Sequence, residues 1–181
     1  MTQRRISAAL YVLMACAFAP ATAIAQTCSA AVPNGSCTAS TTTTMTAGTI
    51  LQLSLGASAT TLAPPGTAGY DAGYVADNGP ATTVKANRSW TLKIAAGSAL
   101  WTATNTTPGV TARANKPASD LQWSTSPGGP FTGTTVAGAT FTSGNATGGT
   151  TTTIYYHTLY DWTLDTPGAY ALVVVLTLSA P

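Results

Sequence analysis

The chain carries little charge, and the charge that it has is of few kinds. Charged residues make up 7% of its 181 residues, glutamate is absent, and histidine occurs once. Two of the seven basic residues, Arg4 and Arg5, lie close to the N-terminus, which leaves 7 − 2 = 5 basic residues against five aspartates in the rest. A nucleic-acid-binding surface needs a concentrated basic stripe. We therefore predict no nucleic-acid partner and a surface solvated mainly by hydroxyl groups.

The same scarcity argues against catalysis. A nucleophilic triad needs a base beside the nucleophile, and the lone His157 falls on the mixed face of an alternating segment, where we predict a rim or solvent-facing side chain. The five aspartates form no recognisable acid/base motif for glycoside hydrolysis. Asp71, Asp77 and Asn78 carry the oxygen ligands that calcium prefers, but their spacing does not match a twelve-residue calcium loop. We predict a noncatalytic protein with no cofactor and no metal.

The N-terminal segment predicts export. Arg4 and Arg5 precede an apolar run over 6–20, which is too short to span a bilayer comfortably, and Ala23-Ile24-Ala25 supplies the small residues that signal peptidase needs. We predict a signal peptide over 1–25, no transmembrane segment in the mature chain, and a location in the periplasm, at the cell surface or outside the cell. An alternative is a lipid anchor at Cys16, because residues 13–16 read as a loose lipobox.

Cysteine is also scarce, since only Cys28 and Cys37 remain after such a leader. The sequence Val-Pro-Asn-Gly between them suits a β-turn, so we predict a small disulfide-closed loop, as is common in exported proteins. The threonine cluster over 38–46 follows as an extended lead-in or a first edge strand. We expect residues 26–46 to form this loop and lead-in, and residues 47–181 to form one domain.

No part of that domain shows a sustained helical period, whereas threonine, valine, tyrosine and tryptophan favour half-buried strands. We expect residues 61–73 to form a loop and residues 143–149 a glycine-rich connector. The predicted strands and one hairpin are 50–55, 82–86, 89–95, 121–124, 131–141 (a hairpin with Gly138 near its bend), 153–165 and 170–179. Short strands separated by turn residues predict an all-β fold, a single antiparallel immunoglobulin-like β-sandwich.

The alternation of apolar and polar residues predicts which tryptophans lie in the core. Trp90 is in phase with Leu92 and Ile94, and Trp123 and Trp162 are also in phase with apolar neighbours, so we predict that all three lie in the core. Trp101 lies outside any clear alternation and is the candidate for a carbohydrate contact. The last strand is apolar on both faces, which is typical of a strand that is central or lies under a partner.

Two families are similar to parts of the chain. The stretches Trp90–Leu92 and Trp162–Leu164, with the C-terminal sequence LTLSAP, resemble the cell-surface WxL domain of bacteria over residues 84–181. That resemblance implies a β-rich domain that attaches noncovalently to the cell wall through Trp90, Leu92, Trp162 and Leu164. The chain departs from the pattern at Val174-Val175, where a tryptophan would be expected.

The ending TPGAYALVVVLTL is also similar to the last strand of pilin-like subunits of the spore-coat-U type. The chain lacks the widely spaced cysteines of those subunits. Both resemblances imply a location outside the cytoplasm. We expect an exported structural or adhesive protein whose partner is a cell-wall or surface polysaccharide or a like subunit. The alternatives are a filament subunit that assembles by strand exchange and a carbohydrate-binding module.

Overall fold

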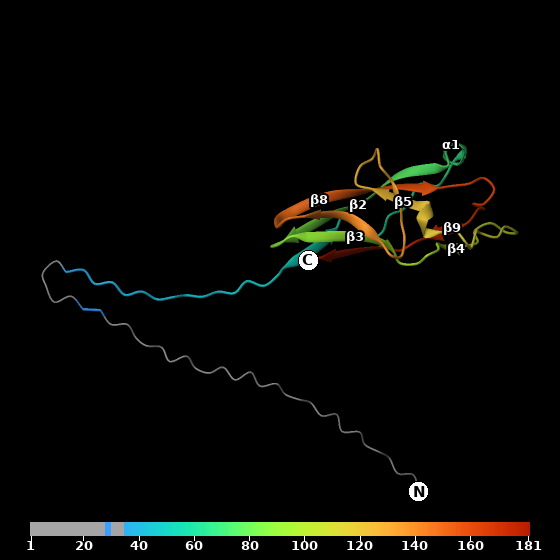
Figure 1. Ribbon diagram of the computed structural model, residues 1–181. Helices are drawn as coiled ribbons and strands as arrows, with labels where there is room; N and C mark the ends of the chain where they lie inside the picture. The colour runs from blue at the N-terminus through green and yellow to red at the C-terminus, as the bar shows by residue number, and fades with distance from the viewer. Residues whose placement is uncertain (1–27, 30–34) are drawn as a thin grey trace, which may run out of the picture. The chain divides into compact units, whose positions relative to one another are not determined.

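The computed structural model describes residues 28–29 and 35–181 (Figure 1), so the predicted signal peptide and Cys16 lie outside the described residues. The chain divides into two units, Met1–Thr46 and Ala47–Pro181. In the first, Cys28 and Cys37 form the predicted disulfide, with their Cα atoms 5.8 Å apart. Residues 35–46 are exposed and have no regular secondary structure, so the edge strand considered for 38–46 does not form within the chain.

The second unit consists of antiparallel sheets with two short helices. The strands of each sheet are given below in their order across the sheet, so that strands named next to each other are hydrogen-bonded. A five-stranded sheet contains β1 (Leu51–Leu55), β2 (Tyr74–Ala86), β8 (Thr147–Leu159), β5 (Leu121–Ser124) and β6 (Thr132–Gly133); a three-stranded sheet contains β10 (Val174–Ser179), β3 (Trp90–Ala96) and β7 (Ala139–Gly144); a small sheet contains β4 (Thr102–Thr104) and β9 (Ala169–Ala171); the helices are α1 (Thr67–Ala72) and the 3-10 turn η1 (Ala118–Asp120). The prediction of a β-rich, antiparallel fold is confirmed.

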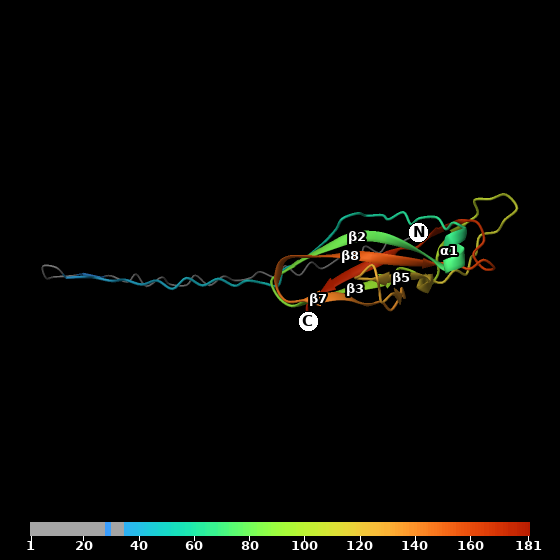
Figure 2. The same cartoon turned by 90° about the horizontal axis from the view of Figure 1, so that it is seen from above.

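One hydrophobic core receives side chains from both larger sheets. Figure 2 shows β2 beside β8 and β3 beside β7, and each of these four strands contributes buried apolar residues to a single cluster. Leu92 and Ile94 in β3 are fully buried, because alternate residues of a strand point to the same face. Trp90 is buried in line with them, and Trp123 packs edge-on against Phe141 at 5.6 Å between ring centroids. The predicted core positions of Trp90 and Trp123 are confirmed.

Strand β2 is longer than predicted, since it begins at Tyr74 rather than near Thr82. Its pairing with β8 shifts register between Asn78 and Ala81. Gly79 lies at this irregularity, and a Cβ atom there would collide with the ring of Tyr156. A glycine is therefore required for the strand to pass this ring.

Several other predicted elements differ from the structure. The glycine-rich connector predicted over 143–149 is mostly strand, because β7 ends at Gly144 and β8 begins at Thr147. The 131–141 hairpin does not form, because β6 and β7 belong to different sheets and Gly138, with φ of 71°, turns the chain between them. The predicted loop over 61–73 contains α1, which ends at Gly73 in the left-handed conformation. The strand predicted over 170–179 is divided into β9 and β10, which pair with β4 and β3.

Candidate functional site

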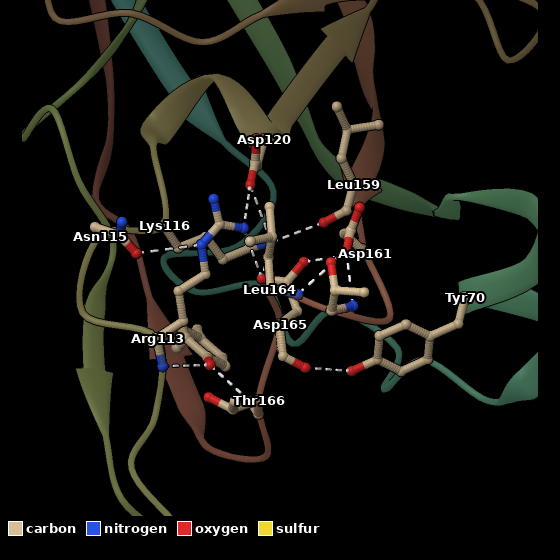
Figure 3. A network of polar contacts seen from close by, with 12 residues as sticks. Tyr70, Arg113, Asn115, Lys116, Asp120, Leu159, Asp161, Leu164, Asp165 and Thr166 are labelled. Carbon is tan, nitrogen blue, oxygen red and sulfur yellow. Dashed lines mark hydrogen bonds and ion pairs between the residues drawn. The ribbon is translucent and has the colours of Figure 1, made fainter.

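A buried ionic cluster joins the segment over 113–120 to the turn after β8 (Figure 3). Lys116 is 1% exposed, and its Nζ lies 2.9 Å from Asp165 Oδ1, 3.2 Å from Asp120 Oδ2 and 2.7 Å from the carbonyl oxygen of Leu159. These three acceptors match the three protons of an ammonium group. The lysine is therefore fully satisfied and offers no free donor for chemistry.

Arg113 completes the charge balance of this cluster. Its Nη1 lies 3.0 Å from Asp165 Oδ1 and 3.4 Å from Asp120 Oδ2, so two cations face two carboxylates. The backbone N–H of Arg113 donates to Tyr170 Oη, which in turn donates to the carbonyl of Thr166. Because each charged group has a partner, the cluster holds the segment before η1 against the turn after β8 and does not form an open site.

Strand β8 ends at Leu159, six residues earlier than predicted, and a turn follows it. The Asp161 carboxylate accepts hydrogen bonds from the backbone of Thr163 and Leu164 and from the Thr163 hydroxyl, and these bonds, led by the hydroxyl's, hold the pKa of Asp161 below its usual value. Aspartate favours turns by this kind of bonding. Apolar and polar residues continue to alternate in the sequence after Leu159, which is why the strand was predicted to extend further.

The turn overturns one predicted core position. Trp162 is 59% exposed and Leu164 is 53% exposed, so the prediction that Trp162 lies in the core is wrong. Its indole stacks on Tyr70 of α1, with 4.5 Å between centroids and 27° between planes, and its Nε1 donates to Asp71 Oδ1 at 3.1 Å. Tyr160 lies behind Tyr70 at 5.6 Å. We call Tyr70, Asp71 and Trp162 the aromatic ledge.

A cavity of about 960 Å³ opens beside the core. It is lined by the inward side chains of β8 and β10 and by the segment 57–65, which has no regular structure. Tyr156, one of its wall residues, is 4% exposed, and burial raises its pKa to about 12. Apolar and aromatic residues make up most of the wall, which suits an uncharged occupant.

Trp101 is part of this cavity wall rather than of the protein surface. It is 6% exposed, so it does not offer the exposed face that a carbohydrate platform on the surface would need. Its Nε1 and the Thr158 hydroxyl are both buried without a hydrogen-bond partner among the described residues. The bridge between Leu100 and Pro117 fixes the chain just before Trp101. This contact between segments distant in sequence places the indole inside the domain, and local alternation could not predict it.

The outer strand β10 has an unprotected edge. Within the described residues it pairs only with β3, and Val174–Ser179 contains no charged residue and no proline. Val175 is 42% exposed and Val173, just before the strand, is 68% exposed. Edge strands of monomeric proteins commonly carry lysine, proline or a bulge that prevents pairing with another chain. The sequence predicted that this strand is covered on both faces, whereas in the single chain the face of β10 that carries Val175 is exposed.

Two other candidate groups are engaged within the fold. His157 is half-buried, as a rim side chain would be: its ring stacks against Phe131 at 3.5 Å and Tyr74 at 4.2 Å, and burial lowers its pKa. Asp77 accepts from the backbone N–H of Ala63, whereas Asp71 accepts from Trp162, so the two carboxylates have different partners. Across residues 28–29 and 35–181, histidine, cysteine and acidic side chains form no metal-binding group of three.

Comparison with family models, with curated proteins and with solved structures finds no match to this chain. In the described part of the chain, no helix is long and apolar enough to cross a membrane. The four WxL-like positions do not share one face, because Trp90 and Leu92 are buried whereas Trp162 and Leu164 are exposed.

Proposed function

We propose that the protein is an exported, noncatalytic structural subunit with an immunoglobulin-like β-sandwich, and that copies associate by strand addition at the bacterial surface or in the periplasm. In this account, residues 38–46 of one copy, which we call the arm, pair along β10 of another. The observation that carries the proposal is the uncharged edge of β10, which is unpaired among the described residues and lies beside a cavity that its own side chains line.

The edge favours a strand as its occupant. The unpaired N–H and C=O groups of an edge strand are a template for another strand. Val174 and Leu176 of β10 line the cavity, and β1, the edge strand of the other large sheet, contacts β10. A strand placed along β10 would satisfy backbone groups and cover apolar side chains in one step. This combination favours a peptide strand over a small ligand.

The arm favours the role of donor. It is rich in threonine, which has a high strand propensity, and it contains no charge that pairing would bury. Its residues are exposed and belong to no strand. Beyond it, the side chain of Asn87 accepts a hydrogen bond from the N–H of Ile50 at 2.9 Å and donates to the carbonyl of Gly48 at 2.7 Å, which fixes the chain where it enters β1.

Attachment to a wall polysaccharide, as the WxL resemblance implies, shares the same exported location. The separation of the four WxL-like residues between core and surface weakens it as a direct mechanism. Strand addition is the better-supported proposal, because both of its components, an exposed arm outside any strand and an open edge, are present in one chain.

The test compares two double variants of the mature protein, Thr41→Pro with Thr43→Pro and Thr41→Ser with Thr43→Ser. Proline removes two backbone donors that a strand needs, whereas serine keeps them. Size exclusion with light scattering over a wide concentration range should show assemblies for the parent and the serine variant and monomers for the proline variant. A parent that stays monomeric throughout, or a proline variant that assembles as the parent does, would refute the proposal.

A further inference from the structure

We infer that the aromatic ledge of Tyr70, Asp71 and Trp162 is a binding site for the sugar rings of an uncharged polysaccharide. This site includes no residue of the arm or of β10, although Tyr70 also lines the cavity beside β10, and it adds recognition of a second kind of partner to the proposed assembly. It also moves the carbohydrate contact predicted from sequence from the buried Trp101 to the exposed Trp162.

Exposure of the indole is the first argument. Trp90, Trp101 and Trp123 are at most 8% exposed, whereas Trp162 is 59% exposed. Its large apolar surface is left in water although the fold buries every other tryptophan. Leu164 on the same turn is also exposed, and contiguous exposed apolar surface marks an interaction site.

The ledge is also held in a fixed position. The Tyr70 hydroxyl donates to the carbonyl of Asp165 at 3.0 Å, and the Asp165 carboxylate is bound in the buried ionic cluster. The backbone N–H of Asp165 donates to the carbonyl of Asp161, and that of Asp161 donates to Asp165 Oδ2 at 2.9 Å. These bonds fix the turn that carries Trp162. A surface ordered before binding loses little entropy when its ligand arrives.

The chemistry around the indole matches a pyranose ring. One face of Trp162 is taken by Tyr70, and the exposed remainder offers an apolar surface on which the C–H groups of a sugar can stack. Asp71 Oδ1 accepts the indole N–H, and within the described residues no hydrogen bond reaches its Oδ2. A carboxylate oxygen beside an aromatic ring is a suitable acceptor for sugar hydroxyls.

Charge narrows the ligand class. Asp71 and Asp161 are both exposed acids within this part of the surface, and neither has an ion-pair partner among the described residues. Like charges repel across an interface, so an anionic polysaccharide is disfavoured. The ledge therefore suits hydroxyl-rich, uncharged chains such as glucans, mannans, galactans or N-acetylglucosamine oligomers.

The test is affinity electrophoresis of the mature protein through gels that contain each of these soluble neutral polysaccharides, with alginate as the anionic comparison. We expect at least one neutral polysaccharide to retard the parent protein. The affinity for that polysaccharide should be at least tenfold lower in Trp162→Ala and unchanged in Val136→Ala. Val136 is 56% exposed but lies outside the ledge, which makes it a matched apolar control. Retarding saccharides should also shift the fluorescence of Trp162 to shorter wavelength.

The inference fails if no neutral polysaccharide retards the protein, or if Trp162→Ala is retarded as strongly as the parent. It also fails if Trp162→Ala lowers the assembly mass by light scattering while sugars do not bind, because the ledge would then be a contact between copies. Assembly that depends on the arm is tested by the proline variants alone, so the two proposals can fail separately.

Discussion

At the residue scale, the most informative feature is how few charges the chain has and where it places them. Two of the five basic residues beyond the predicted leader, Arg113 and Lys116, and two of the five aspartates, Asp120 and Asp165, occupy one cluster with little solvent exposure. Burying charges is costly unless each is paired and hydrogen-bonded. The cluster meets that condition, and it ties the turn that carries the ledge to the rest of the domain.

Removal of Lys116 should therefore be strongly destabilising. Lys116→Met leaves two carboxylates to share Arg113, and we expect the free energy of unfolding to fall by about 3 kcal/mol. The measurement is urea denaturation of the mature protein. Lys85→Met is the matched control, because Lys85 is exposed on β2 and should change stability by no more than about 0.5 kcal/mol. Equal, small effects of both substitutions would show that the cluster does not stabilise the fold.

His157 gives a prediction about pH. Burial lowers the pKa of His157 from its ordinary 6.5, so the unfolded chain binds this proton more readily than the folded chain. The free energy of unfolding should fall as the pH is lowered from about 7.5 to about 5.5. His157→Phe, which keeps a ring between Tyr74 and Phe131, should remove this part of the slope. An unchanged slope in the variant would assign the pH dependence to other groups.

Single-residue alternation predicted Trp90 and Trp123 correctly and Trp162 incorrectly. The first two lie within strands, where a period of two sets the direction of each side chain. Trp162 keeps the same phase in the sequence, but Asp161 ends the strand by bonding to Thr163 and Leu164. Asp161 was the available signal for the turn, because an aspartate can end a strand by bonding to the backbone that follows it. The regular alternation on both sides of Asp161 predicted a continuous strand instead.

At the scale of the element, local sequence predicted strands better than it predicted their partners. The segments that became β1, β3 and β5 were recognised from composition and alternation. The hairpin predicted between Phe131 and Phe141 failed because Gly138 directs the chain into the other sheet. Sheet membership depends on contacts far apart in sequence. The ionic cluster was missed for the same reason, since its members come from segments that are distant along the chain.

Strand β3 is the central strand of its sheet and provides a test of its alternation. Leu92 has no exposed surface, whereas Lys93, the next residue, points outward. Leu92→Ala should lower the free energy of unfolding by about 2–5 kcal/mol through lost burial and a residual cavity. Lys93→Ala should change it by no more than about 0.5 kcal/mol. Thermal or chemical denaturation compares the two, and similar losses would contradict the assigned face.

At the scale of the whole molecule, two properties of the chain have one explanation. The arm over 38–46 has strand-forming residues but forms no strand, and β10 is apolar and uncharged but leaves one edge unpaired within the described residues. A second copy supplies what each lacks. The sequence indicated part of this, because a last strand that is apolar on both faces is typical of one covered by a partner.

The most direct test of strand addition is amide hydrogen exchange of the mature protein, followed by mass spectrometry at low and high concentration. Amides that enter a strand ladder exchange slowly, whereas those of an unpaired segment exchange at close to their intrinsic rates. We predict that peptides covering the arm and β10 become protected together as concentration rises, while those of the buried strand β3 do not change. Rapid exchange of the arm at every concentration would contradict the account.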